Sequence, residues 1–141
     1  MKKIISILFI AMLFIAGCDD GNEAKAQTSS FYTMTGGDTV VNTATVNLDA
    51  TVTQSWSVAS FSVVATEVSG TTDGTCLLQA GNDGTNYNDI STDTLQLADV
   101  TTQSFNWSVT SVPYHYYRVK CTGVGTMANI VAGSATFRRE W

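Results

Sequence analysis

The sequence predicts an all-β protein, a single antiparallel β-sandwich or jelly roll of about eight strands behind an N-terminal signal helix. Thr, Ser, Gly, Asn and Val dominate the chain after the N-terminal segment, and β-branched residues with few helix formers are typical of strands and turns. Short β-type segments recur between turn signals, whereas no extended helical pattern follows the N-terminal segment. The 141 residues leave room for one domain.

The N-terminal segment has the three-part layout of a secretory signal. Lys2 and Lys3 precede an uncharged apolar run, Ile4–Ala16, and small residues lead to Cys18. The run of about 13 residues is too short to cross roughly 30 Å of hydrocarbon as a helix. Residues 1–17 are therefore predicted to be a signal peptide. An ordinary signal peptide or an uncleaved anchor, with an incidental cysteine, is the alternative.

The end of this segment, Ile15-Ala16-Gly17-Cys18, resembles the lipobox of bacterial lipoproteins. In that family the cysteine is lipidated, and cleavage leaves it as the first residue. The resemblance implies that acyl chains on Cys18 hold the chain at a membrane. It places the protein in the cell envelope, either periplasmic or surface-exposed.

Residues 18–30 are predicted to be the lipidated cysteine and a flexible linker, because they are polar and aperiodic. Residues 31–141 form the predicted sandwich domain. The whole chain has a net charge of −5, and loss of Lys2 and Lys3 would leave five basic residues against twelve acidic ones, a charge of −7. Such a charge argues against nucleic acid as a partner, since phosphate binding needs clustered Lys and Arg.

Strand signals start with Thr39–Leu48, which is rich in β-branched residues. In the next run, Gln54–Val68, the apolar residues change parity between Trp56 and Phe61, which predicts a bulge or a bend between two strands. Thr71–Gly74 is predicted to be a turn, because its Asp-Gly pair suits positive φ.

The later strands are each bounded by polar or glycine-containing breaks. Alternation places Phe105 and Trp107 on one face of their strand, and Tyr117 and Cys121 on one face of theirs. The predicted strands are Thr75–Ala80, Tyr87–Ile90, Thr94–Val100, Ser104–Val109, Tyr114–Cys121 and Met127–Phe137.

Three cysteines are present, and setting Cys18 aside for lipid leaves Cys76 and Cys121. An even pair in a chain routed to an oxidising compartment predicts a disulfide. Both cysteines fall on the predicted inner face, which favours their meeting. The alternative is a pair of buried free thiols that act as small apolar residues.

Two segments together resemble small β-sandwich modules of bacteriophage virion surfaces, such as head-fibre, capsid-decoration and tail-associated proteins. They are TCLLQAGNDGTNYNDI (75–90) and YHYYRVKCTGVGTMANIVAGSATF (114–137). The shared pattern is a strand, an Asn-rich turn with an aromatic residue, a late Tyr-rich strand and a Gly-rich hairpin. The resemblance implies a sandwich with exposed loops and a binding or assembly role. The lipoprotein-type start departs from most proteins of this kind.

The sequence predicts no enzyme, no cofactor and no metal site. His115 is the single histidine, and it is interpreted as a strand-end residue rather than a member of a catalytic triad. No G-x-S-x-G, P-loop or H-E-x-x-H pattern occurs. The oxygen-rich segment 82–93 offers carboxylates and amides to calcium, but its spacing is not that of an EF-hand, and Asx residues are ordinary turn formers.

The candidate ligand-binding residues are Tyr114, Tyr116 and Arg118, which alternate along one predicted strand face beside Lys120. An exposed aromatic row with polar neighbours is typical of a face that binds sugar or protein. The alternative is cross-strand pairing on a solvated sheet.

The leading hypothesis is a non-catalytic, lipid-anchored surface module that is encoded by a bacterium, phage or prophage. It would touch a protein or glycan partner, and a homo-oligomer is a further expectation. The two alternatives are a virion structural protein, which would lie on the virion surface, and a carbohydrate-binding module.

Overall fold

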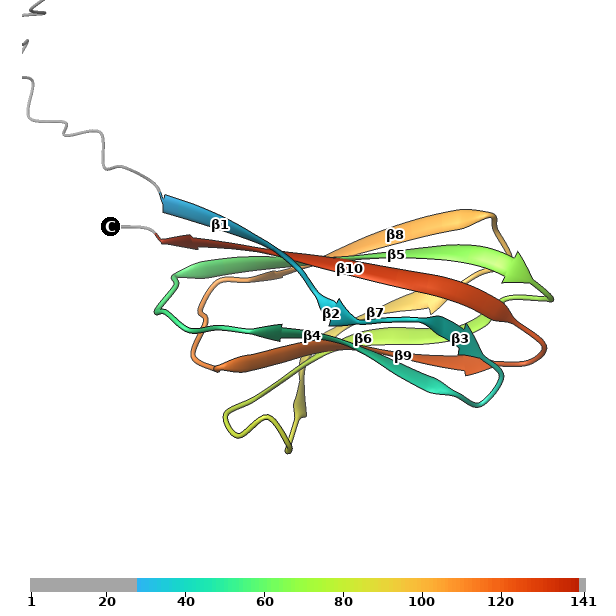
Figure 1. Ribbon diagram of the computed structural model, residues 1–141, viewed down its shortest axis with the longest axis horizontal. Coiled ribbons are helices and arrows are strands. Elements are labelled where there is room, and N and C mark those ends of the chain that lie inside the picture. Colours follow the sequence, from blue (N-terminus) through green and yellow to red (C-terminus); the bar gives the residue numbers. More distant parts are fainter. Residues whose placement is uncertain (1–27, 140–141) are drawn as a thin grey trace, which may run out of the picture.

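The repeated alternation of apolar and polar residues builds a β-sandwich in the computed structural model, which describes residues 28–139 (Figure 1). All the regular elements in this range are strands. They are β1 (Thr28–Thr33), β2 (Thr35–Gly36), β3 (Thr39–Val41), β4 (Thr45–Thr51), β5 (Val58–Ser69), β6 (Asp73–Gly81), β7 (Asn88–Leu97), β8 (Thr102–Val109), β9 (Tyr116–Val124) and β10 (Ala128–Arg139). The predicted all-β class is confirmed. Within the same range, no helix has the length and apolar character needed to cross a membrane.

The strands form two five-stranded sheets, and every named pairing between strands is antiparallel. Sheet A has the order β1-β10-β5-β8, and β3 also pairs with β10. Sheet B has the order β2-β4-β9-β6-β7. The first three strands therefore alternate between the sheets, so the start of the domain contacts both layers.

The core lies between the sheets and contains the residues that alternation assigns to inner faces. Phe61 of β5 is fully buried, as are Tyr117 of β9 and Phe137 of β10. The Phe61 and Tyr117 rings stack with centroids 4.9 Å apart, and Phe137 meets Phe61 edge-on at 5.7 Å. The Phe61–Tyr117 contact joins sheet A to sheet B, whereas the Phe61–Phe137 contact lies within sheet A.

The bulge or bend predicted between Trp56 and Phe61 is wrong in its position: the register of β5 (Val58–Ser69) with β10 is regular there and shifts only near Val68. β5 begins only at Val58, and Trp56 lies in the preceding loop, where its ring centroid is 6.2 Å from that of Phe137. The parity change therefore marks the start of the strand. The turn predicted at 71–74 also shifts: Gly74 has the expected positive φ, of 138°, but it already lies in β6, which begins at Asp73, and Gly70 before it has a φ of 82°.

The two strands predicted over 87–90 and 94–100 form one strand, β7, with an interruption of its register. The strand predicted over 39–48 is instead divided, because Thr43 has a φ of 58° between β3 and β4. β1 begins at Thr28, so the last three residues of the predicted linker 18–30 lie in sheet A. The exposed, Ser/Thr-rich β1 gave no strand signal of its own.

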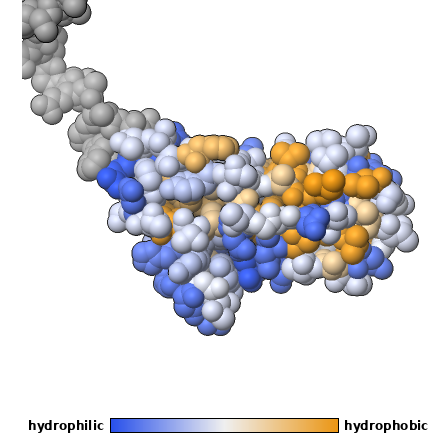
Figure 2. Space-filling model, in the orientation of Figure 1, coloured by the Kyte–Doolittle hydropathy of each residue, from blue (hydrophilic) through white to orange (hydrophobic). Residues whose placement is uncertain are grey.

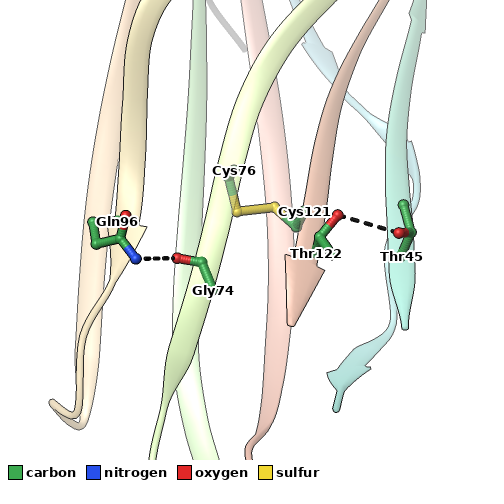
Figure 3. Close-up of a disulfide and its surroundings, with 6 residues drawn as sticks. All are labelled: Thr45, Gly74, Cys76, Gln96, Cys121 and Thr122. Atoms are coloured by element: carbon green, nitrogen blue, oxygen red, sulfur yellow. Dashed lines mark hydrogen bonds between the residues drawn. A yellow bond between two sulfur atoms is a disulfide. The ribbon is translucent and has the colours of Figure 1, made fainter. Parts of the chain in front are cut away.

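The predicted disulfide is present between Cys76 of β6 and Cys121 of β9, with an S–S distance of 2.04 Å (Figure 3). The two residues are direct register partners in sheet B, and both are fully buried. Polar contacts flank the bridge: the Thr45 and Thr122 hydroxyls lie 3.2 Å apart, and Gln96 Nε2 donates to the Gly74 carbonyl at 2.9 Å.

Candidate functional site

The outer face of sheet B carries the polar and aromatic side chains that the sequence pointed to, but in a different combination. Tyr116 and Arg118 lie on this face of β9, half-buried among their neighbours. Tyr114 does not belong to the predicted row, because it precedes β9 and packs against the core, with its ring 6.1 Å from that of Tyr117. The candidate site therefore keeps Tyr116 and Arg118 and loses Tyr114.

A polar row crosses sheet B from β4 to β7. Strand register aligns Asp49 with Arg118, Arg118 with Gln79, and Gln79 with Asp89. Arg118 Nε donates to Gln79 Oε1 at 2.7 Å, and Gln79 Nε2 donates to Asp89 Oδ1 at 2.7 Å. The Arg118 guanidinium also lies 3.9 Å from the centroid of the Tyr87 ring. These contacts fix the Arg118 side chain and orient it before any partner arrives.

The electrostatics of this row reflect partial burial. Burial raises the pKa of the Asp49 carboxyl, and the positive charge of Arg118 only partly opposes that effect. Burial likewise raises the pKa of the Tyr87 hydroxyl, with a further contribution from the negative charge of Asp49. Strand register brings the four residues of the row together, since they come from four separate strands. They are Asp49, Gln79, Asp89 and Arg118.

The turn between β6 and β7 projects from the sandwich beside this row (Figure 1), and its surface is mainly hydrophilic (Figure 2). Asp83 organises the turn: its Oδ1 accepts from the backbone N–H groups of Thr85 and Asn86 at 2.9 and 2.7 Å. Gly84 has a φ of 69° and faces the Tyr116 ring so closely that a Cβ there would lie 3.3 Å from it. The backbone of the turn at Gly84 thus packs against the Tyr116 ring.

The hydrogen bonds that the Asp83 carboxylate accepts in this turn are expected to be lost only at unusually low pH. The hydrogen bonds from Asn86 and Thr85 lower the pKa of Asp83 from 3.8 to about 2. Because the pKa is depressed in the folded state, the stabilisation is complete above pH 3.8 and disappears as the pH falls through about 2. The amide resonances of Thr85 and Asn86 should therefore titrate with a midpoint near 2. In Asp83→Asn this titration should vanish, and a wild-type midpoint near pH 4 would contradict the assignment.

Beside the row, a groove of 480 Å³ opens where β7 leaves β6. Its lining residues are Leu77, Asp89, Ile90, Ser91, Thr92 and Thr94. Asp89 belongs both to this groove and to the polar row, so the two features form one continuous surface. The sequence indicated an Asn-rich turn here, but a groove made by a break in strand register has no local sequence signal.

Neither the histidine nor the acidic residues form a reactive cluster among residues 28–139. Both the backbone and the ring of His115 contact Val52. The Val52 N–H donates to the His115 carbonyl at 2.8 Å, and His115 Nδ1 lies 3.3 Å from the Val52 carbonyl oxygen. In this range no three His, Cys, Asp or Glu side chains are grouped so that they could hold a metal ion. Cys18, the predicted lipidation site, lies outside the described residues.

The chain matches no protein-family model and no curated protein sequence. Among solved structures it is similar to the Bacillus endospore appendages described as disulfide-linked pili, with 11% identity, a TM-score of 0.43, and coverage of 81% of this chain and 86% of that one. The Yersinia pseudotuberculosis-derived mitogen gives 12% identity, the same TM-score and the same coverage. A chain from infectious bursal disease virus, Gx strain, gives 24% identity and a TM-score of 0.33, over 79% of this chain and 29% of that one.

Proposed function

We propose that this protein is a non-catalytic, exported β-sandwich that is anchored in a bacterial envelope by lipid on Cys18 and acts by contact with a protein or glycan. The observation that carries the proposal is the buried Cys76–Cys121 disulfide. Structural disulfides form and persist in oxidising compartments outside the cytosol. Export of the kind predicted by the N-terminal signal supplies such a compartment.

The position of β1 supports a tethered domain. This strand starts at Thr28 on an edge of sheet A, ten positions after Cys18. The residues between them lie outside the described range; as the linker that the sequence predicts, ten residues would have an r.m.s. reach of roughly 18 Å and would hold the sandwich just clear of a membrane. The outer face of sheet B, with the fixed Arg118 and its aromatic neighbours, would then be free for contact.

The non-catalytic part of the proposal is supported by the placement of the chemistry-bearing side chains. Arg118 is engaged with Gln79 and Tyr87, and Asp83 caps its own turn. His115 contacts the backbone of Val52. None of these arrangements pairs a nucleophile with a base.

Lipid attachment is tested by metabolic labelling with a fatty-acid analogue. The wild-type chain should incorporate the label and partition with membranes, because acylation adds apolar chains to an acidic protein that has few other means of attachment. Cys18→Ser should lose the label while the domain still folds. Equal labelling of both proteins, or recovery of the native chain from cytosol with Met1 still present, would refute the proposal.

A phage or prophage origin is the narrower form of the proposal. It is supported by the resemblance of segments 75–90 and 114–137 to virion-surface modules, and these segments contribute β6, β9 and β10 to the sandwich. Mass spectrometry of purified virions, together with capsid or tail genes beside this one, would favour a virion role over an envelope role.

A further inference from the structure

The groove beside the polar row arises from an interruption in the pairing of β6 with β7. Leu77 pairs with Thr94, and Gln79 pairs with Asp89. Between these two pairs β6 advances by two residues, whereas β7 advances by five. The extra residues of β7 leave the sheet as a bulge. Trp107 of β8 holds the bulge in place, because its Nε1 donates to the Asp93 carbonyl at 2.8 Å. The groove lined by Leu77 and residues 89–94 lies at this bulge.

The lining of the groove combines an apolar floor with a hydroxyl and carboxylate rim. Leu77 and Ile90 are half-buried and supply the apolar part. Asp89 stands at the wall, where Gln79 Nε2 holds its Oδ1 at 2.7 Å, while the other carboxylate oxygen, Oδ2, makes no hydrogen bond to any residue in the range 28–139. The remaining rim residues are Ser91, Thr92 and Thr94.

We propose that this groove is a binding site for a neutral saccharide. A sugar ring has an apolar C–H face and a rim of hydroxyl groups. The C–H face would pack on Leu77 and Ile90, and a hydroxyl group would donate to the Asp89 carboxylate. The volume of 480 Å³ lies within the range of about 300–1,000 Å³ typical of small-molecule sites. Asp89 and the net charge of −5 disfavour acidic sugars. Tyr87, two residues before Asp89, and Arg118, which lies over the Tyr87 ring, would contact the neighbouring sugar unit.

The site deepens the contact role proposed above and rests on it, because it names a neutral saccharide as the glycan, but it needs neither the lipid on Cys18 nor the envelope location. Fatty-acid labelling and saccharide binding are separate measurements, so the failure of either is distinguishable from the failure of the other.

The test is a titration of the ¹⁵N-labelled full chain, in micelles of a non-glycosidic detergent, with cellotetraose, maltotetraose and chitotetraose. At least one of these neutral probes should shift the amide resonances of Leu77 and of residues 89–94 saturably at millimolar concentration. Tetragalacturonate is the anionic counterpart and should bind more weakly. Absence of shifts with all three neutral probes, shifts confined to other parts of the domain, or tighter binding of tetragalacturonate would overturn the proposal.

Asp89→Asn examines the carboxylate without changing the shape of the groove, since the new amide oxygen can still accept from Gln79. Affinity for the bound tetrasaccharide should fall roughly tenfold to a hundredfold, as expected for loss of a charge-assisted hydrogen bond. Asp38→Asn is the matched control, because Asp38 is equally exposed but lies beside β3, where it accepts from the Thr39 N–H. Equal affinities of the Asp89→Asn variant and the wild-type chain would refute the role of Asp89 and with it the site.

Discussion

Removing the disulfide with the double substitution Cys76→Ala/Cys121→Ala is expected to lower the free energy of unfolding by about 4 kcal/mol. The bridge closes a segment with a sequence separation of 45, and cross-linking so long a loop restricts the unfolded chain strongly. Because domains of this kind are stable by only about 5–15 kcal/mol in total, the loss would remove much of the margin. Urea denaturation followed by tryptophan fluorescence measures the difference.

A reductant supplies the control for this experiment. It should move the denaturation midpoint of the wild-type chain toward that of the double variant and leave the variant unchanged. A stability loss below about 1 kcal/mol would contradict the loop-closure argument. It would mean that residual pairing of the β6 and β9 segments restricts the unfolded chain even without the bridge.

Phe61→Ala is expected to destabilise the domain by about 3–5 kcal/mol, comparable to the effect of losing the disulfide. Phe61 is fully buried, stacks on Tyr117 and meets Phe137 edge-on, so its removal opens a cavity at the contact between the two sheets. The backbone on both sides is fixed by strand pairing, which limits how far the site can collapse. Thermal and urea unfolding would both report the change.

Phe31→Ala is the matched control, because the same ring is removed from a side chain that is 68% exposed. Its expected effect is within about 0.5 kcal/mol. If the two variants were equally destabilised, the burial pattern of sheet A would be wrong, and so would the assignment of Phe61 to the inter-sheet core.

Alternation predicted the core because each inward position depends only on its near neighbours in sequence. Tyr117 was placed correctly on the same face as Cys121, and the shared inner face of Cys76 and Cys121 anticipated their bridge. Turn chemistry also indicated the Asn-rich connection that precedes β7. The inward positions of a strand recur with a period of two residues, which a single sequence displays directly.

The candidate site could not be predicted in the same way, since its residues meet through register between strands that are distant in sequence. Asp49 reaches Arg118 only because β4 pairs with β9, and Asp89 reaches Gln79 only after β7 has bulged. Tyr114 was assigned to the wrong surface because β9 begins only at Tyr116, so the alternation of the strand does not extend to Tyr114, which packs against Tyr117 instead.

The hydrophilic turn and the hydrophobic side chains also lie at different parts of the surface (Figure 2). Exposed hydrophobic residues occur on β3 and near the start of β10, where Val41 and Ile130 are 43% and 51% exposed, away from the turn that carries Asp83. Contacts made through the polar row would therefore leave the apolar end uncovered.

The bond between Cys76 and Cys121 closes a long loop of the chain. It encloses β7 of one sheet, β8 of the other and the projecting turn in a single covalent ring. An extracellular protease that nicks this turn would leave both halves of the polypeptide linked and still paired along β6 and β9. In this exposed turn, therefore, a cut peptide bond cannot separate the pieces.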